Sequence, residues 1–419
     1  MKKIYREIIE CRICRNKDLI SILHLGQQCL TGVFPKAKTR KVPCGPLELV
    51  KCNDQNNKNN CGLVQLKHSY ESTALYGDGY GYRSSLNRSM ADHLKAKADD
   101  IMSQGILKPG DLVVDIGSND GTLLGFYPSE GLTLLGVDPS GKALKKYYPA
   151  HVHLLPDFFS ANLVKLSYGP RKAKVITSIA MFYDLKDPVG FMRQVYDILD
   201  DEGIWLLEQS YLPAMLERVA YDTVCHEHLE YYGLKQIAWM AGKVGFNIIK
   251  AGLNDTNGGS FELVLARGRR PQKQEARRIA ALTTQEEQMG LSTLGPYARF
   301  KERIFAHRES LRATVAQINA EGKKIIGYGA STKGNVILQF CGFTPKEIPF
   351  IAEVNKDKIG SYTPGTRIPI ISEEEARAMK PDYMMVLPWH FKENIIIREQ
   401  DYLKGGGKLL FPLPQIEII

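Results

Sequence analysis

Short apolar runs alternate with helical spacing over the middle of the chain. Four of these runs have the length and the β-branched content of buried strands: 111–116, 132–137, 174–178 and 203–208. Apolar residues at helical spacing separate them, for example over 188–199. This alternation of strand and helix predicts a doubly wound parallel sheet. Two more strands, 246–251 and 261–266, have no helix between them, so we expect an antiparallel hairpin at one edge of the sheet.

A second, smaller α/β pattern follows a long basic stretch. Residues 268–320 favour helix and are interrupted near Gly295-Pro296, so 297–320 are predicted to form one long helix. Beyond them, four predicted strands alternate with helices: 323–327, 349–354, 382–387 and 408–411. The patterns therefore predict an N-terminal ribbon, a central Rossmann-like domain and a small C-terminal Rossmann-like α/β domain, with the ranges 1–68, 69–267 and 268–419.

Six of the eight cysteines fall within residues 1–62, which in a cytoplasmic protein indicates a metal site before disulfides. Cys11 and Cys14 form a two-residue knuckle, and the best second pair is Cys52 and Cys61, which a polar insert separates. A closed tetrahedral site of four thiolates holds zinc in a structural role. It would stabilise a segment too small to bury a core of its own. The remaining cysteines of this segment are rival ligands: Cys29 and Cys44.

The composition, 44% hydrophobic and 24% charged, is typical of a globular chain. No apolar run reaches the ~18 residues that a membrane span needs, and the first residues lack a secretory apolar segment. We therefore expect a soluble, cytoplasmic protein without a membrane partner. The net charge of +9 is concentrated in residues 1–62 and 267–312, which suits nucleic acid or a nucleotide diphosphate; solvated helix faces are the alternative.

Residues 113–121, Val-Val-Asp-Ile-Gly-Ser-Asn-Asp-Gly, lead from a strand into a glycine-rich bend. Glycines let the backbone approach a ligand at the carboxyl edge of a sheet. The bend lacks the third glycine of a dinucleotide site and carries acidic residues, so a neutral or positively charged nucleoside such as S-adenosylmethionine fits better. The residues of this segment expected at the cofactor are Asp115, Gly117, Asn119 and Asp120.

Two further positions complete the predicted cofactor site. Asp138 ends the next strand, 23 residues after Asp115, where its carboxylate could accept hydrogen bonds from two ribose hydroxyls. Asp157 and Phe158 follow the third strand and are expected to bond the adenine amine and to stack on its ring.

Residues 221–232 are dense in titratable side chains and follow a strand, so they should lie over the carboxyl edge of the sheet. His226, Glu227 and His228 are consecutive; in an extended segment the two histidines would point one way and the glutamate the other. Histidine titrates near neutrality, which suits a general base. A zinc hydrolase is excluded, because it needs His-Glu-x-x-His. The alternative is that these residues form a hydrogen-bonded structural pair that caps a loop.

Two loops are candidates for holding a substrate. Tyrosines interleaved with glycines over 75–85, among them Tyr76 and Tyr82, would form an adaptable lid; a plain aromatic linker is the alternative. The loop 327–334 opens a helix with glycines, hydroxyls and Lys333, which makes it a candidate anion site; a turn without a ligand is the alternative. Later residues complete the expected substrate-binding set: Asn335, Asn355, Lys358 and Tyr362.

Four motifs in this order resemble those of the deoxysugar C-methyltransferases: Cys-Gly-Leu-Val-Gln-Leu at 61–66, Asp-Ile-Gly-Ser-Asn-Asp-Gly-Thr at 115–122, His-Glu-His at 226–228 and Gly-Tyr-Gly-Ala-Ser-Thr-Lys-Gly at 327–334. The resemblance covers essentially the whole chain. These enzymes methylate nucleotide-linked keto-sugars. The resemblance implies a zinc ribbon, a central domain that binds S-adenosylmethionine and a C-terminal domain that helps to hold the sugar nucleotide.

The resemblance also implies roles for single residues. His228 has the position of the catalytic base and Glu227 that of a sugar-binding or supporting acid. Tyr76 would contact substrate. Independently of the resemblance, His226 is expected only to orient the loop.

Two positions depart from the family pattern. In the family, a tyrosine that assists the enolate stands at the position of Cys225. Residues 180–183, which follow the predicted strand 174–178, lack the histidine that the family has there. Tyr183 is a candidate for the missing phenol; otherwise the sugar, the methylated carbon or the acceptor atom differs.

The sequence therefore predicts an S-adenosylmethionine-dependent C-methyltransferase, a monomer or weak homo-oligomer, that acts on a nucleotide-diphosphate 4-keto-deoxysugar at C-3. One alternative is a nucleic-acid-modifying or small-molecule O-methyltransferase. Another is a sugar-nucleotide-binding protein without catalysis. The ribbon has few aromatic residues to stack on bases, which argues against nucleic acid.

Overall fold

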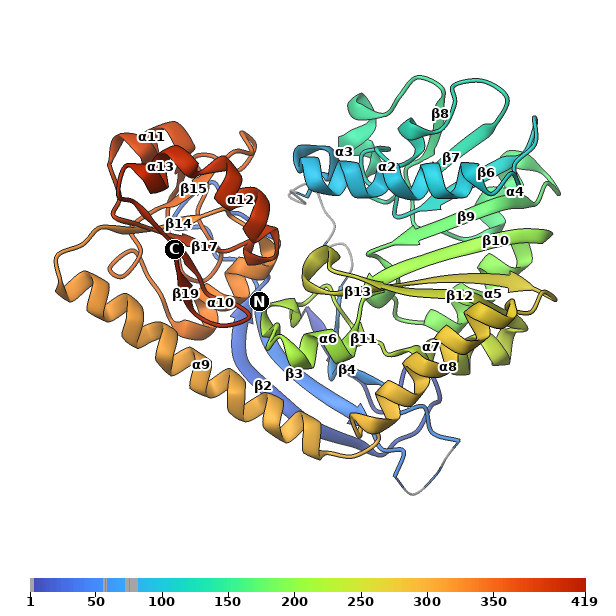
Figure 1. The fold of residues 1–419 in the computed structure, drawn as a ribbon, viewed down its shortest axis with the longest axis horizontal. Coiled ribbons are helices and arrows are strands. Elements are labelled where there is room, and N and C mark those ends of the chain that lie inside the picture. Colours follow the sequence, from blue (N-terminus) through green and yellow to red (C-terminus); the bar gives the residue numbers. More distant parts are fainter. Residues whose placement is uncertain (1–3, 56, 58, 72–74, 76–81) are drawn as a thin grey trace.

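A computed structural model describes residues 4–55, 57, 59–71, 75 and 82–419. Figure 1 shows a central sheet on one side, a smaller C-terminal sheet on the other, and the N-terminal strands between and below them. Among the described residues, no helix combines the length and the apolarity that crossing a membrane requires.

The central sheet has seven strands in the order β12-β13-β10-β9-β6-β7-β8. Its parallel strands are β6 (Leu112–Ile116), β7 (Thr133–Val137), β8 (Val152–Leu155), β9 (Ala173–Ile179) and β10 (Leu199–Ser210). At the edge beyond β10, β13 (Ser260–Arg267) and β12 (Phe246–Asn254) pair antiparallel. The predicted doubly wound sheet and its edge hairpin are confirmed.

Helices cover both faces of this sheet, because each strand alternates apolar side chains between two cores. One face packs against α4 (Ala161–Tyr168), α5 (Pro188–Ile198) and α7 (Leu234–Val244). The other packs against α2 (Arg88–Ser103), which the sequence patterns missed. Its start is signalled by Asn87, whose side chain caps the helix by accepting from the backbone N–H of Ser89.

The C-terminal sheet has six strands in the order β16-β15-β14-β17-β18-β19. They are β14 (Ile325–Tyr328), β15 (Ile351–Glu353), β16 (Ile370–Ser372), β17 (Tyr383–Val386), β18 (Lys408–Phe411) and the antiparallel β19 (Glu417–Ile418). The helices of this part are α10 (Thr332–Cys341), α11 (Glu373–Ala378), α12 (Lys392–Arg398) and α13 (Gln400–Lys404). Helices α8 (Lys273–Gln288) and α9 (Gly295–Ala320) connect it to the central sheet, and α9 confirms the predicted long helix.

Three of the N-terminal strands share a sheet with a strand from the central part of the chain. β2 (Leu19–Cys29), β3 (Cys44–Cys52) and β4 (Val64–Leu66) are joined by β11 (Glu230–Tyr231), which directly follows the His-Glu-His segment. A short pair, β1 (Tyr5–Glu7) and β5 (His68–Tyr70), lies beside them. The N-terminal part is therefore hydrogen-bonded to the segment that carries the candidate base.

One apolar core runs through the N-terminal strands, the residues around 212–231 and the C-terminal sheet. β2 lies along α9 in Figure 1 and also packs against α10. The side chain of Gln339 bonds the backbone N–H and C=O of Cys29 at 2.7 and 3.1 Å. The three parts of the chain therefore share buried surface.

Candidate functional site

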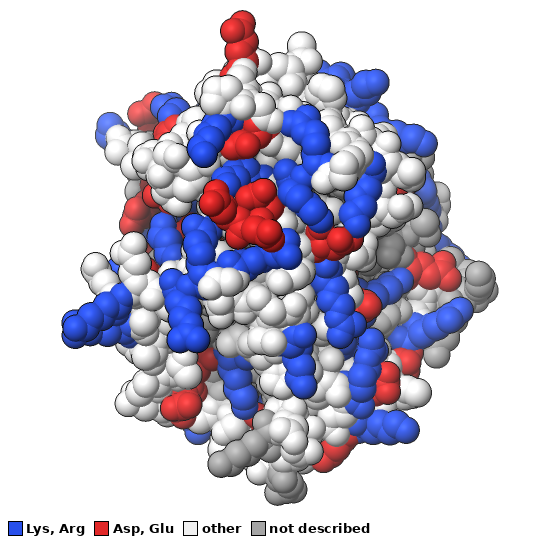
Figure 2. Space-filling model, turned by 90° about the vertical axis from the view of Figure 1, so that its right-hand side faces the viewer, with Lys and Arg blue, Asp and Glu red and all other residues white. Residues whose placement is uncertain are grey.

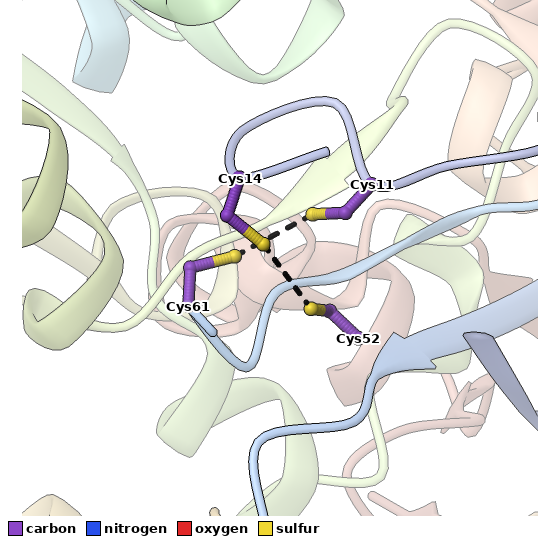
Figure 3. Close-up of side chains that lie close together, drawn as sticks. All are labelled: Cys11, Cys14, Cys52 and Cys61. Carbon is purple, nitrogen blue, oxygen red and sulfur yellow. Dashed lines mark hydrogen bonds between the residues drawn. The ribbon is translucent and has the colours of Figure 1, made fainter. Parts of the chain in front are cut away.

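Four cysteines converge on one point in the N-terminal part, as Figure 3 shows. The Sγ atoms of Cys11, Cys14, Cys52 and Cys61 all lie within 4.8 Å of one another, and those of Cys11–Cys61 and Cys14–Cys52 are 3.5 Å apart. Tetrahedral bonds of about 2.3 Å to zinc place sulfurs roughly 3.8 Å apart, so the cluster has the size of a zinc site. The predicted ligand set comes together, and its closed, thiolate-only shell fits a structural ion.

The two rival cysteines are held elsewhere. Cys29 and Cys44 are directly opposed on β2 and β3 and form a disulfide. Their sulfurs are therefore not ligands of the four-cysteine cluster.

A pocket of about 320 Å³ opens at the carboxyl ends of β6, β7 and β9, where open α/β sheets bind ligands. Its lining includes the expected residues Asp115, Gly117, Asn119, Asp138 and Phe158. Gly117 has φ of 78°, and a Cβ there would lie 2.8 Å from Met181 Cγ, so only glycine fits this turn.

The acidic groups of this pocket favour a cationic ligand. Burial raises the pKa of Asp115 to about 7, and Thr177 donates to its carboxylate at 2.6 Å. Asp138 accepts from the backbone N–H groups of Asn119 and Ser140 at 2.8 and 2.7 Å, which fixes it at the mouth of the bend. A mostly apolar pocket with a fixed carboxylate suits a nucleoside that carries a sulfonium, so these residues fit S-adenosylmethionine.

Two expected cofactor residues lie outside the pocket lining. Asp120 accepts from the backbone N–H of Ser85 at 3.1 Å and thereby holds the segment before α2. Asp157 accepts from the backbone N–H of Phe158 at 2.7 Å. Both side chains accept from backbone N–H groups, a structural role that motif spacing does not distinguish from ligand binding.

His228 has the geometry of a general base. Its Nδ1 lies 2.8 Å from the carbonyl oxygen of Thr223, which can only accept, so the proton sits on Nδ1 and Nε2 keeps its lone pair. The ring lies 4.2 Å, centroid to centroid, from that of Tyr183. Burial, and after it the charge of Lys333, lowers the pKa of His228 to about 3.

The other two residues of the motif contact different neighbours. His226 is fully buried, its ring meets Tyr70 edge-on at 4.8 Å, and burial lowers its pKa to about 4. Glu227 is buried, accepts from the hydroxyl of Thr31 at 3.4 Å and has its pKa raised by burial. The backbone bends at residues 226 and 227, ahead of the strand that begins at Glu230, and the two histidine rings contact different neighbours, Tyr70 and Tyr183.

Tyr183 belongs to the short turn η4 (Phe182–Asp184), which lies between His228 and the cofactor pocket. Met181 and Asp184 line the pocket, while Tyr183 contacts His228. The other tyrosine expected at the reaction, Tyr76, lies outside the described residues.

A second cavity, of about 740 Å³, lies between the start of α2 and the carboxyl edge of the C-terminal sheet. Asn355 and Lys358 line it as expected, and Tyr82 lines both this cavity and the cofactor pocket. Sequence reasoning missed the three arginines of its wall, Arg83, Arg88 and Arg398, since α2 was not predicted and α12 shows no motif.

Three expected substrate-binding residues do not line this cavity. Lys333 Nζ donates to the carbonyl of Asn257 at 2.9 Å, and Asn335 Nδ2 donates to that of Thr31 at 2.7 Å. The backbone N–H of Tyr362 bonds the carbonyl of Pro35. In the loop 327–334, the predicted anion site, Ser331 Oγ caps α10 by accepting from Gly334 N–H at 2.9 Å. This hydroxyl is therefore already hydrogen-bonded within the loop.

Comparison with known proteins agrees with this arrangement. Residues 11–76 match a family model of a zinc binding domain, 82–251 a methyltransferase domain and 255–414 a C-methyltransferase C-terminal domain. C-methyltransferase NovU of Streptomyces niveus is 29% identical over 422 residues, covering 100% of this chain and 99% of that protein.

Solved structures resemble only part of the chain. A TehB-like SAM-dependent methyltransferase of Corynebacterium glutamicum is 14% identical, with a TM-score of 0.30, over 42% of this chain and 87% of its own. The plantazolicin methyltransferase BpumL in complex with SAH is 12% identical, with a TM-score of 0.34, over 42% of this chain and 83% of its own.

The family models and the pocket define the class: the chain is an S-adenosylmethionine-dependent methyltransferase with a structural zinc site. The three family models follow one another along the chain, and the chain is similar to a C-methyltransferase over its whole length.

Proposed function

We propose that this enzyme methylates a ring carbon, C-3, of a nucleotide-diphosphate 4-keto-deoxysugar in the cytoplasm. The observation that carries the proposal is the turn η4 together with the residue before it: Met181 and Asp184 line the cofactor pocket, and the ring of Tyr183 contacts that of His228. His228 shares a small cavity with Tyr183 and does not itself line the cofactor pocket; we propose that the substrate joins the two. A relative named as a C-methyltransferase over its whole length supports carbon as the acceptor.

The chemistry assigned to His228 follows from its tautomer. A ketone acidifies the neighbouring C–H, and Nε2 of His228 accepts that proton while the electron pair moves onto the ketone oxygen as an enolate. When bound, S-adenosylmethionine supplies a methyl group on a positively charged sulfur. The enolate carbon takes this methyl, a carbon–carbon bond forms as the carbon–sulfur bond breaks, and the two charges are neutralised together.

The larger cavity is proposed to hold the nucleotide diphosphate. Lys358, Arg88 and Arg398 give its wall positive groups, and Glu353 ends β15 at the position where an acid can meet ribose hydroxyls. Glu353 accepts from the backbone N–H groups of Ala330 and Asn355, both at 2.8 Å, so its carboxylate is fixed before a ligand arrives. Tyr82, shared by both cavities, lies where the sugar would pass between them.

The surface gives less support to a nucleic acid. Figure 2 shows Lys and Arg side chains interspersed with Asp and Glu on one face of the molecule. Surface lysines pair with acids at several points, as Lys174 does with Asp200 at 3.1 Å. Mixed charge lacks the continuous basic stripe of a nucleic-acid groove.

Incubation with S-adenosylmethionine carrying a labelled methyl group and a panel of keto-sugar nucleotides tests the proposal. Mass spectrometry would give the mass gain, and two-dimensional NMR the atom that carries the label. A carbon–carbon bond at C-3 is expected. Label on oxygen would establish an O-methyltransferase instead, and tight binding of a sugar nucleotide without transfer would indicate a binding protein. Label in RNA would identify a nucleic-acid acceptor.

A further inference from the structure

The arginine inside the cysteine knuckle, Arg12, is buried, with a side chain that is 3% exposed. A guanidinium withdrawn from water needs partners for its five N–H groups, which it presents in one plane as a rigid fork. The arginine that directly follows the knuckle, Arg15, lies at the surface, and its side chain is 57% exposed. Burial of a charged side chain between two predicted zinc ligands therefore distinguishes Arg12 and calls for an account of its partners.

The fork of Arg12 reaches three strands at once. Its Nη1 donates to the carbonyl oxygen of Leu66 in β4 at 2.7 Å, and to the side-chain oxygen of Gln65 at 3.2 Å. Its Nη2 donates to the hydroxyl of Ser69 in β5 at 2.8 Å. Its Nε faces the carboxylate of Glu230 in β11 at 3.5 Å, and the side chain of Glu230 is fully buried as well. A lysine could not make these contacts together, because its three donors sit on one nitrogen.

The same guanidinium lies against the residue that follows the candidate base. Nη1 of Arg12 is 3.5 Å from the carbonyl oxygen of Leu229, which also accepts from the backbone N–H of Leu66 at 2.8 Å. On its other side, the backbone N–H of Leu229 donates to the carbonyl oxygen of Tyr183 at 2.8 Å. Leu229 therefore connects the knuckle to the backbone of Tyr183, whose ring contacts that of His228.

We propose that Arg12 is a positioning residue of the proton-transfer step: its guanidinium links the cysteine knuckle to the backbone at 228–230 and thereby holds His228 against Tyr183. The proposal rests on the role proposed above for His228. Arg12 is not part of the described lining of the cofactor pocket or of the larger cavity, so it acts through the segment that it holds. The same contact offsets the charge of Glu230, which lines the small cavity of His228.

Hydrogen exchange tests this proposal without any substrate. The zinc-loaded full chain with S-adenosylhomocysteine would be followed by mass spectrometry of the peptides that cover 224–232, where the Leu229 N–H reports its bond to Tyr183. Arg12→Lys keeps a positive charge beside Glu230 but loses the fork. In this variant, exchange over 224–232 should become faster by roughly tenfold, the effect of losing about one net hydrogen bond. Exchange in β6 and β7 should stay as in the natural protein, and elemental analysis should still find one zinc per chain.

Arg15→Met is the matched control. Arg15 also follows a ligand cysteine, but its partners are Glu10 at 3.4 Å and Asp187 at 3.9 Å on the surface. Its replacement should leave exchange over 224–232 unchanged.

A second variant covers the case in which Arg12→Lys does not fold. Arg12→Met with Glu230→Gln removes both charges of the buried pair, so that neither is left in the core without its partner. The folded, zinc-loaded double variant should show the same faster exchange over 224–232, because it also lacks the fork.

The natural rate of exchange over 224–232 in a folded, zinc-loaded Arg12 variant would overturn the proposal, as would equally fast exchange in Arg15→Met. Loss of zinc from Arg12→Lys would also overturn it, because the residue would then act through the metal cluster. This readout needs no turnover, so its outcome is separate from the identity of the substrate.

With an active substrate in hand, kinetics give a second readout. In Arg12→Lys, kcat should fall by roughly tenfold, since a displaced base slows the chemical step, while KM and the affinity for S-adenosylmethionine stay unchanged. An unchanged kcat, or a rise in KM alone, would overturn the positioning role.

Discussion

At the scale of the residue, His228 carries the proposed chemistry. Deprotonation precedes methyl transfer, so the protein with S-adenosylhomocysteine in place of the donor should exchange the substrate C–H for deuterium from D₂O. His228→Ala should slow this wash-in, followed by NMR, by ~10²–10⁴-fold, the usual contribution of a general base. His226→Asn should do less, because that ring packs on Tyr70. Wild-type exchange in the His228 variant would transfer the role to another group.

Asp138 is the residue that tests the cofactor pocket. Asp138→Ala removes a fixed carboxylate from the pocket mouth and should weaken S-adenosylmethionine binding by about 1.5–3 kcal/mol, as measured by calorimetry. Asp157→Ala is the companion variant, because Asp157 does not line the pocket. The Asp157→Ala protein should bind S-adenosylmethionine with unchanged affinity. If only the Asp157 change weakened binding, the nucleoside would lie on the other side of Phe158.

His226 predicts a dependence of stability on pH. Its pKa is about 4 in the folded chain, against roughly 6.5 when unfolded, because burial disfavours the charged ring. The unfolded chain therefore binds more protons between these values, and the contribution of the neutral ring, complete above pH 6.5, is lost as the pH falls towards 4. His226→Gln should remove this loss. In thermal melts, the Tm of His226→Gln should rise relative to that of the natural protein as the pH decreases. A Tm difference that does not change with pH would contradict this prediction.

At the scale of the element, the pairing of β4 with β11 links the zinc site to the His-Glu-His segment. Gln65 and Val64 pair with Glu230 and Tyr231, and Cys61 lies three residues before β4. Loss of zinc should therefore loosen more than the N-terminal part. Cys14→Ser should release the ion, measured by elemental analysis, lower the Tm and reduce methyl transfer although zinc does no chemistry.

A variant of the other cysteine pair separates the effect of zinc loss from the effect of replacing cysteines in general. Cys29→Ser with Cys44→Ser removes the disulfide between β2 and β3 but no ligand of the cluster, so one zinc per chain should remain. Full zinc occupancy after replacement of both Cys11 and Cys61 would disprove the ligand assignment.

At the scale of the whole molecule, the shared core predicts that the C-terminal part does not fold alone. Leu23, Leu25, Leu47 and Leu49 of the N-terminal strands belong to the same buried cluster as the C-terminal sheet. A fragment of residues 268–419 would expose the surface that they cover, and each large apolar side chain left in water costs roughly 1.5–3 kcal/mol. The fragment should bind the dye ANS and lack a cooperative thermal transition. Co-expression with residues 1–267 should abolish ANS binding and restore the cooperative transition. A sharp, cooperative melt of the isolated fragment would support three independent domains with the predicted bounds.

The α/β class and the zinc ligands followed from the sequence because both depend on local pattern. Strand–helix alternation reports the sheet type, and the knuckle Cys11–Cys14 implies a second pair wherever it lies in the chain. The edge hairpin at β12 and β13 was predictable for the same reason, since no helix intervenes. The residues Asp115, Gly117 and Asp138 could be placed at the pocket because the carboxyl ends of parallel strands meet at one edge.

Only the tertiary structure decided which side chains meet across the segments. Nothing near Lys333 in the sequence indicates that its ammonium bonds Asn257, and nothing near Cys29 indicates Cys44 rather than the metal cluster. The addition of β11 to the N-terminal sheet joins residues more than 160 positions apart. Such contacts arise where segments that are distant along the chain pack closely against each other. There, a glycine or a single backbone carbonyl determines the direction of a neighbouring side chain. Local spacing therefore determined the chemistry available to this protein, and packing determined where each group acts.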